Sequence, residues 1–350
     1  MPYDIENTRF AEVDLDDPFF DSLKQDYSDF EGWFRRKSDQ PAYVLRDDEG
    51  TQAFLYLKIE DEAVEDVDPS LPPRRHLKIG TFKINAHGTR LGERFMKRAF
   101  DYALSKDAHD IYVTVFPKHE PLVELFQKYG FEKAGTKTTE NGTEDVYLRS
   151  LDSTVGGVVQ DYPLIHHRNR DKYILSIYPD WHTQLLPDSI LNNETIDLLD
   201  DASYTNSIHK AYICSMEGVS ELERGDLLLI YRTTDREGQA YYRSVVTSTC
   251  VVEEYRSRND FENVGHFIDY CEKYSIFDAD DLKGWWHRWN PLHVIRFTYN
   301  VPLQRRLNRK RLLEDVGLPE DVYWGFFQIS NGAFHRIIEL GDVDKSYLVD

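Results

Sequence analysis

Residues suited to holding an anion gather in one short run, KINAHGTRLGERF, which spans 83–95. Gly88 and Gly92 leave room for a ligand to come close to the backbone, and Arg90 and Arg94 add positive charge. A turn directly before a helix also presents unpaired backbone N–H groups and the positive end of the helix dipole. This run therefore predicts a site for a phosphate or pyrophosphate group.

Two elements must position that turn. The segment over 74–84, RRHLKIGTFKI, alternates apolar and polar residues as a strand does, and the segment from Leu91 to Leu104 carries one apolar helical stripe. Further expected elements are a helical stretch over 18–38, a hairpin turning at Glu49-Gly50, a strand over 110–116, a helix over 120–129 and a strand pair ending near Arg149. The first part of the chain is thus predicted to be mixed α/β.

The strand, turn and helix resemble motif A of the GNAT acetyltransferases, whose loop reads Gln/Arg-x-x-Gly-x-Gly/Ala. His87 stands at the Gln/Arg position, Arg90 replaces the first glycine and Gly92 matches the second. A second segment, IYVTVFPKHEPLVELFQKYGFEKAG over 111–135, is similar to the family's strand and following helix, which ends in LYxxxGF. The resemblance covers roughly residues 9 to 150 and implies an α/β GNAT fold, with a mixed central sheet flanked by helices.

The resemblance implies acetyl-CoA as cosubstrate and an amine as acceptor, although it leaves the acceptor unidentified. The implied CoA contacts are Phe82, Lys83, Ile84, His87, Gly88, Thr89, Arg90, Leu91, Gly92, Glu93, His119 and Phe126. Direct transfer to an amine needs a nearby base, a backbone N–H that polarises the thioester carbonyl, and close placement of the two reactants. No covalent enzyme intermediate is implied.

Acid and base assignments are less direct, because the sequence departs from the family at both positions. The tyrosine that protonates the departing thiolate in many GNAT enzymes is replaced by Phe126, and Tyr129 is a candidate substitute. No acid stands on the strand over 74–84, so His76 is the candidate base, since imidazole can accept a proton from an ammonium group. Glu60 and Glu62 are alternative bases, and His119 could serve in binding or in proton transfer.

The second part, from about residue 160, contains β-branched and aromatic runs separated by turn residues, which favours many strands with few helices. GDLLLIYRTT, followed by a long strand-like run, resembles the PUA-like barrels that include ASCH and EVE domains. A C-terminal, mainly β, PUA-like barrel domain with short helices is therefore expected. The helices are predicted over 188–200, 260–274 and 302–316.

PUA-like domains often bind RNA or modified nucleotides, so a basic surface is of interest. On a helix over 302–316, Arg305 and Arg309 would stack, as would Arg306 and Lys310, into one positive face. Trp286 could stack a base close by. Alternatively, the basic residues could form a solvated helix face, and Trp286 could belong to the core of the barrel.

The length of the chain favours two domains, because 350 residues exceed the usual size of one hydrophobic core. The boundaries expected are 1–153 for the GNAT domain, 154–160 for a linker around Gly156-Gly157, and 161–350 for the barrel. A net charge of −20 repels phosphate polymers at long range. Without an apolar run long enough to span a bilayer, and with three scattered cysteines, the chain is expected to be cytoplasmic, with no membrane partner and no metal site.

The leading hypothesis is an acetyl-CoA-dependent N-acetyltransferase whose second domain presents the acceptor, with RNA or a nucleotide as a further partner. One alternative is a degenerate GNAT domain that binds CoA without turnover, beside a barrel that reads nucleic acid or a modified nucleotide. Another is a toxin that acetylates tRNA.

Overall fold

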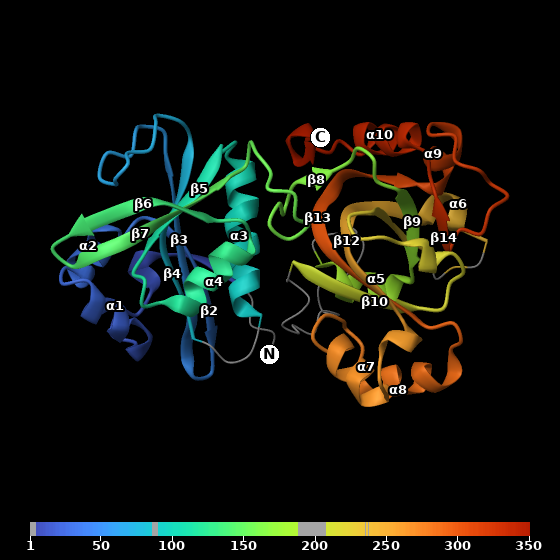
Figure 1. The fold of residues 1–350 in the computed structure, drawn as a ribbon, viewed down its shortest axis with the longest axis horizontal. Helices are drawn as coiled ribbons and strands as arrows, with labels where there is room; N and C mark the ends of the chain where they lie inside the picture. Colours follow the sequence, from blue (N-terminus) through green and yellow to red (C-terminus); the bar gives the residue numbers. More distant parts are fainter. Residues whose placement is uncertain (1–4, 86–89, 188–207, 235, 237) are drawn as a thin grey trace. The chain divides into compact units, whose positions relative to one another are not determined.

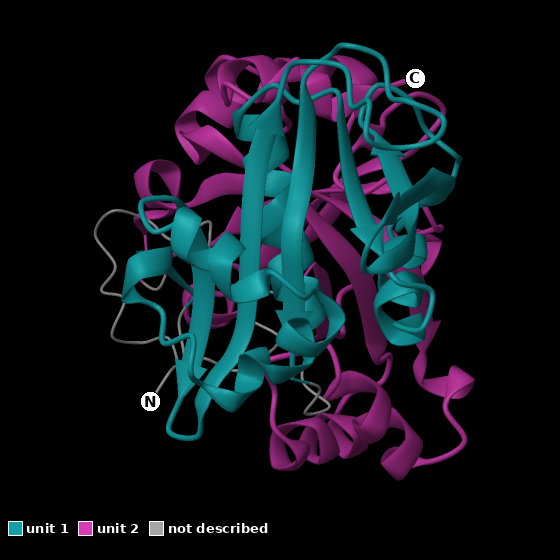
Figure 2. Ribbon diagram, turned by 90° about the vertical axis from the view of Figure 1, so that its left-hand side faces the viewer, with its two compact units in different colours: residues 1–160 teal, residues 161–350 magenta. Residues whose placement is uncertain are grey.

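The computed structural model describes residues 5–85, 90–187, 208–234, 236 and 238–350. The chain divides into two compact units, Met1–Gln160 and Asp161–Asp350 (Figure 2). No helix within the described ranges is long and apolar enough to cross a membrane.

Unit 1 is built on a seven-stranded sheet in the order β1-β2-β3-β4-β5-β7-β6 (Figure 1). Its strands are β1 (Glu6–Arg9), β2 (Pro41–Asp47), β3 (Gly50–Glu60), β4 (His76–Ile84), β5 (Asp110–Val115), β6 (Glu132–Thr139) and β7 (Gly142–Ser150). Only β4 and β5 run parallel, because α3 connects them, and every other neighbouring pair is antiparallel. The mixed sheet expected from the sequence is confirmed, including the hairpin at Gly50.

Helices cover the sheet of unit 1. They are α1 (Asp21–Asp26), α2 (Phe30–Arg36), α3 (Leu91–Ser105) and α4 (Glu120–Lys128), with short 3₁₀ helices at Phe10–Glu12 and Pro18–Phe20. An aromatic core that includes Phe20, Phe34 and Phe54 packs α1 and α2 on β2 and β3. Because Phe54 pairs with Lys83 across the sheet, Lys83 points to the face of α1 and α2, and its neighbour Phe82 points to the other face.

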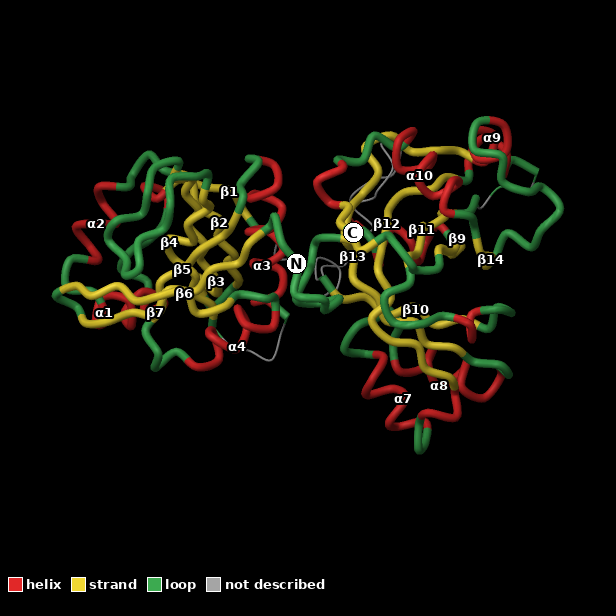
Figure 3. Tube along the Cα trace, turned by 45° about the horizontal axis from the view of Figure 1, so that its top comes forward, coloured by secondary structure: helices red, strands yellow, loops and turns green. Residues whose placement is uncertain are grey.

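Unit 2 is mainly β, with a six-stranded sheet in the order β10-β13-β12-β11-β9-β14. The strands are β9 (Lys172–Ile177), β10 (His209–Cys214), β11 (Leu227–Arg232), β12 (Val245–Ser257), β13 (His293–Asn308) and β14 (Phe326–Gln328), while β8 (Ile165–His166) and β15 (Leu348–Val349) form a separate pair. The long strands β12 and β13 shift register three times and curve strongly (Figure 3). Among the described residues the pairing leaves β10 and β14 at the two ends of this curved sheet.

The helices of unit 2 are short. They are α5 (Pro179–Leu185), α6 (Ala240–Arg243), α7 (Val264–Cys271), α8 (Ala279–Arg288), α9 (Arg309–Glu314) and α10 (Asn331–Leu340), with 3₁₀ helices at Val219–Glu221, Arg258–Asp260 and Lys345–Tyr347. The helix predicted over 260–274 is present as α7, and the one predicted over 188–200 lies outside the described residues. Cys214, Cys250 and Cys271 are buried free thiols, and burial raises the pKa of Cys214 to about 12.

The helix predicted over 302–316 is wrong for its first half. Strand β13 continues through Asn308, and α9 covers only the six residues from Arg309 to Glu314. Pairing with β12 decides this, because Asn308 and Leu307 lie opposite Val245 and Val246. Tertiary pairing of this kind overrides the local helix preference of an arginine-rich segment.

Candidate functional site

The hydrogen-bonded pairing of β4 with β5 ends partway along the two strands. Their parallel pairing runs from His76 opposite Asp110 to Ile79 opposite Val113 and goes no further. Among the described residues, β4 beyond that point pairs with β3 alone, and Thr114 and Val115 pair with β7 alone. The edge of β4 from Gly80 to Ile84 therefore faces β5 without a strand partner, so that its backbone groups are available to a ligand.

A register break in β4 marks the start of this opening. Tyr56 pairs with Thr81 and Leu57 pairs with Ile79, which leaves Gly80 as a bulged residue between them. The ring of Tyr56 lies against Gly80, since a Cβ added there would come within 2.6 Å of Tyr56 Cδ1. Glycine is therefore required at the bulge, and the bulge redirects the open segment of β4.

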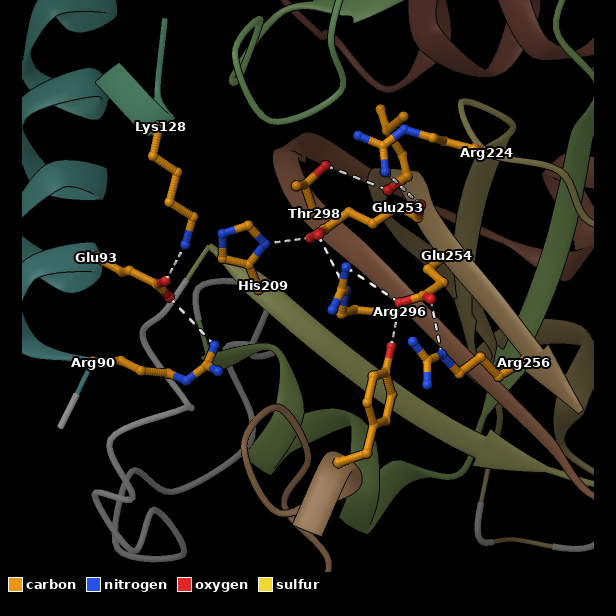
Figure 4. A network of polar contacts seen from close by, with 12 residues as sticks. Arg90, Glu93, Lys128, His209, Arg224, Glu253, Glu254, Arg256, Arg296 and Thr298 are labelled. Carbon is orange, nitrogen blue, oxygen red and sulfur yellow. Dashed lines mark hydrogen bonds and ion pairs between the residues drawn. The ribbon is translucent and has the colours of Figure 1, made fainter. Parts of the chain in front are cut away.

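The first turn of α3 follows the open end of β4. Glu93 lies in this turn between two cations, 3.3 Å from Arg90 Nη1 and 2.6 Å from Lys128 Nζ of α4 (Figure 4). A Cβ at Gly92 would meet Leu125 Cδ2 at 3.0 Å, so this glycine allows α4 to pack closely on α3. An anion bound at this turn would share Arg90 and Lys128 with Glu93.

One face of α1 contacts the end of β4 and the residues that follow β5. Ser22 and Asp26 are four residues apart and thus lie on the same side of the helix. Lys83 of β4 donates a hydrogen bond to Ser22, while Lys118, just after β5, donates one to Asp26. His119, the residue before α4, places Nε2 3.0 Å from Asp26 Oδ2. Helix α1 therefore lies across the mouth of the opening.

The electrostatics here lower the pKa of an acid, Asp26, and of a nearby amine, Lys83. Partial burial opposes ionisation of Asp26, yet the hydrogen bonds from Lys118 and His119 outweigh it and lower the pKa of this carboxyl group. Burial also lowers the pKa of Lys83, against the opposing charges of Asp21, Asp26 and Asp17. The charges of these three carboxylates therefore favour the protonated form of Lys83, against the effect of its burial.

Among the described side chains near Asp26, His119 has a geometry suited to a general base. If the carboxylate of Asp26 accepts the Nε2 proton, the neutral ring keeps its lone pair on Nδ1. The side chain is 41% exposed, so a substrate can reach it. Asp26 holds the ring, and Nδ1 is available for proton transfer.

A further wall comes from the loop after α1 and the β6–β7 hairpin. The hydroxyl of Tyr27 donates to Glu144 Oε1 at 2.6 Å, and the ring of Tyr27 packs on Phe116 at the end of β5. Burial, followed by the bond to Glu144, raises the pKa of Tyr27 well above its usual range. The Tyr27 hydroxyl therefore stays protonated and acts as a hydrogen-bonding group.

Two of the predicted bases are placed elsewhere. His76 is the first residue of β4, about 23 Å from Lys83 at ~3.3 Å per residue, and it is 1% exposed. Its Nδ1 lies 2.5 Å from Asp110 Oδ1 and its Nε2 lies 2.8 Å from the Pro72 carbonyl oxygen. Glu60 pairs directly opposite His76 and accepts hydrogen bonds from Tyr112 and Lys58. Both residues therefore lie at the end of β4 and β3 where β4 is paired with β5, away from Lys83, and their roles as bases stay predictions.

The predicted substitute acid, Tyr129, lies away from His119. It is fully buried at the end of α4, about 15 Å along the helix from His119 at ~1.5 Å per residue, and packs on Phe100. Phe126 is fully buried as well, but its ring lies 5.6 Å from that of Phe82 on the open segment of β4. Phe126 therefore packs a phenyl ring against the segment of β4 that has no β5 partner.

The remaining predicted CoA contacts divide into two groups. Phe82, Lys83 and Ile84 lie on the open segment of β4, and Arg90, Leu91, Gly92 and Glu93 lie at the start of α3. His87, Gly88 and Thr89 are outside the described residues. Within the described ranges no three His, Cys, Asp or Glu side chains form a group that could hold a metal ion.

The positive face predicted in unit 2 does not form. Arg305 and Arg306 lie on β13, where neighbours point to opposite faces, and Arg309 and Lys310 lie on α9. Arg305 is exposed and 4.0 Å from Asp342, while Lys310 is 3.8 Å from Glu314. Arg309 stacks on Trp324, with its guanidinium carbon 4.5 Å from the ring centroid.

Trp286 is not part of that region either. It lies on α8, packs on Phe267 of α7 and carries the guanidinium of Arg258 over its ring at 4.6 Å. Helices α7 and α8 stand at the opposite end of unit 2 from α9 in both Figure 1 and Figure 3. The aromatic and basic residues grouped in the sequence are thus separated by the fold.

Sequence reasoning missed Ser22, Asp26, Tyr27, Lys118, Lys128 and Glu144. Ser22 and Asp26 had a detectable signal, since they share a face of a short amphipathic helix. Nothing local to Glu144 or Lys128 indicates a role, because their partners lie 117 and 35 positions away.

Comparisons with known proteins complete this description. No family model matches the chain, and no curated protein matches it. Several solved structures are similar to part of the chain. The ASCH protein of Zymomonas mobilis is 9% identical, with 49% of this chain and 96% of that chain covered and a TM-score of 0.35. An IAA acetyltransferase of Bacillus cereus is 11% identical, with 41% and 97% covered and a TM-score of 0.31. A GNAT-family acetyltransferase of Streptococcus agalactiae is 14% identical, with 37% and 70% covered and a TM-score of 0.24.

Part of this chain is similar to an ASCH protein, and part to GNAT acetyltransferases. These are the two groups that the sequence resembles.

Proposed function

We propose that unit 1 binds acetyl-CoA in the opening between β4 and β5 and transfers the acetyl group to an amine. The observation that carries this proposal is the end of β4–β5 pairing at Ile79 and Val113, directly before the bulge at Gly80. An extended, amide-rich arm such as pantetheine can hydrogen-bond to the unpaired edge of β4 as an added strand would. The resemblance to GNAT enzymes suggests the cosubstrate, and the unpaired edge of β4 supports this choice.

The phosphates of the cosubstrate would lie at the first turn of α3. Arg90 and Lys128 supply positive charge there, and the N–H groups of the helix start supply hydrogen-bond donors. Glu93 competes for the same cations, so binding a pyrophosphate requires Arg90 and Lys128 to reorient toward it. The expected affinity therefore depends on ionic strength.

The reaction would be a direct transfer. The nitrogen lone pair of a neutral amine attacks the thioester carbonyl carbon, and backbone N–H groups of the open β4 edge stabilise the developing oxyanion. His119 Nδ1 takes the proton that the amine loses, with Asp26 holding the imidazolium. The C–S bond then breaks and its electron pair leaves with sulfur. Since Phe126 cannot donate a proton, the thiolate is protonated by water.

Calorimetric titration of the full chain with acetyl-CoA tests the proposal. Binding is expected, and Lys128→Gln should weaken it while Lys133→Gln, at an exposed position paired with Asp145 on β7, should not. Release of free CoA thiol in the presence of primary amines would then establish turnover. Absence of binding at millimolar acetyl-CoA would overturn the assignment.

A second candidate function rests on the stack of Arg309 and Trp324 in unit 2. Tyr323 beside it is 65% exposed, so an aromatic and a cation meet at the surface, as in sites that stack nucleobases. In this case unit 1 binds CoA without turnover and unit 2 binds RNA or a nucleotide. Single-stranded RNA that binds the wild type but not Trp324→Leu, with no amine acetylated, would favour this candidate.

A further inference from the structure

Unit 2 contains a buried polar cluster that the proposed transferase function does not use. His182 of α5 is fully buried, and its Nε2 lies 2.8 Å from Thr247 Oγ1 on β12. Its other ring nitrogen, Nδ1, is buried with no hydrogen-bond partner. A buried polar atom without a partner is costly, so a ligand atom or a water molecule is needed at this position.

The strands beside this histidine pair irregularly. Pairing between β12 and β13 passes from Val246 opposite Leu307 to Ser248 opposite Pro302. Thr247 alone therefore faces the four residues 303–306 of β13, which bulge away from the ladder. Arg305 N donates instead to the Gly341 carbonyl oxygen, at 2.9 Å. Arg306 is the last of these four residues and directly precedes Leu307, whose partner Val246 is the neighbour of Thr247.

Arg306 has an unusual environment for a guanidinium. It is partly buried, its Nε has no partner, and within the described part of the chain no carboxylate pairs with it. Burial lowers its pKa, against a smaller opposing effect of Tyr299. Burial and then the positive charges of Arg232 and Arg306 lower the pKa of His182 to about 3, so the ring is neutral and both arginines lie near it.

The hydrogen-bond directions define what a ligand beside His182 must supply. Thr247 Oγ1 can donate to the Ile230 carbonyl oxygen, at 3.4 Å, and its lone pairs then accept the Nε2 proton of His182. The neutral ring thus presents a lone pair on Nδ1. The ligand must therefore carry negative charge for Arg306 and, at the same time, a proton to donate to His182.

We propose that Arg306, His182 and Thr247 form a site for a protonated phosphate, either the inorganic ion or a monoester. Hydrogen phosphate has both required properties, since its oxygens accept from a guanidinium and its hydroxyl donates to an imidazole nitrogen. Sulfate and carboxylates carry no proton at neutral pH and fail the second requirement. Arg232 adds positive potential, and the partly exposed side of Arg306 gives access from solvent. This site is independent of the acetyltransferase proposal.

Calorimetry on the full chain at constant ionic strength tests the proposal with inorganic phosphate, sulfate and adenosine monophosphate. Phosphate is expected to bind at least tenfold more tightly than sulfate. Arg306→Gln should weaken phosphate binding tenfold or more, whereas Arg305→Gln, at the exposed neighbouring position, should leave it unchanged. Tighter binding of the nucleotide would identify a monoester as the source, and tighter binding of inorganic phosphate would identify the free ion.

Three results would overturn the site. They are equal affinities for sulfate and phosphate, an Arg306→Gln variant that binds phosphate like the wild type, and phosphate binding that saturating CoA abolishes, which would place the anion in unit 1. Because His182 is fully buried, its substitution could prevent folding, so Arg306, at a partly exposed position, is the deciding variant. Thermal unfolding of Arg306→Gln without phosphate shows whether the variant is folded.

Discussion

His119 and Asp26 are 93 positions apart in the chain, yet the histidine Nε2 lies 3.0 Å from the aspartate Oδ2. The contact joins the segment after β5 to helix α1, and it fixes which ring nitrogen of His119 faces a substrate. In the proposed reaction this pair is the base and its positioning group.

Replacing the base should reduce turnover without affecting cosubstrate binding. His119→Asn is expected to lower kcat by about 100-fold, the contribution typical of a general base, with the dissociation constant for CoA nearly unchanged. His109→Gln is the matched control, because His109 is an exposed histidine at the other end of β5. Steady-state kinetics and calorimetry measure both. Full activity of His119→Asn would exclude this residue as the base.

His76 should prove structural. His76→Leu removes the partner of Asp110 from a buried site and leaves the carboxylate with Arg74 at 3.3 Å. Breaking a buried pair of this kind is expected to destabilise unit 1 by about 3 kcal/mol. Urea unfolding measures the loss. Activity per folded molecule should stay at the wild-type level, and a selective loss of kcat would instead support His76 as a catalytic candidate.

The bulge at Gly80 can be tested by adding one carbon. Gly80→Ala places Cβ within 2.6 Å of the Tyr56 ring and should destabilise the protein by roughly 1–3 kcal/mol. CoA affinity should fall too, because the open edge of β4 must shift. Gly332→Ala in α10 meets nothing closer than 3.9 Å and serves as the control, with a stability equal to or above that of the wild type. A neutral Gly80→Ala would contradict the packing described.

Acid should weaken unit 2 partly through Glu254. Burial opposes its ionisation, but hydrogen bonds from Tyr270 and Arg256 and the charge of Arg296 lower the pKa of this carboxyl group below its usual 4.5 (Figure 4). Its stabilising contribution is therefore complete above about pH 4.5 and is lost as the pH falls through the lower folded-state value. Unfolding curves between pH 7 and pH 3 should show a smaller acid-induced loss for Glu254→Gln than for the wild type. Glu262→Gln, at an exposed position, should follow the wild type.

Much of unit 1 was predictable because its signals are local. Alternation over 74–84 and the apolar stripe from Leu91 identified β4 and α3, and Gly130-Phe131 marked the end of α4. The burial of His76 was not predictable, since a polar residue at a strand start resembles an exposed one until Asp110, 34 positions later, is placed beside it. No local signal in the sequence therefore indicated that His76 is buried beside Asp110.

In unit 2 the helix predicted over 302–316 was wrong for its first half, because a local signal was overridden by strand pairing. The segment around Arg305 has helix-forming residues, yet pairing with β12 extends β13 to Asn308. Local propensity amounts to tenths of a kcal/mol per residue, and a strand ladder with buried side chains exceeds it. The phosphate cluster depends on the same long-range pairing, so no local pattern around His182 indicates it.

Helix α1 contains only six residues, and two of them, Ser22 and Asp26, hold the free ends of β4 and β5 from one side. In the proposed reaction, the approach of the acceptor and the alignment of the base therefore both depend on this short helix. A change in the length or tilt of α1 would then alter amine selectivity and reaction rate together.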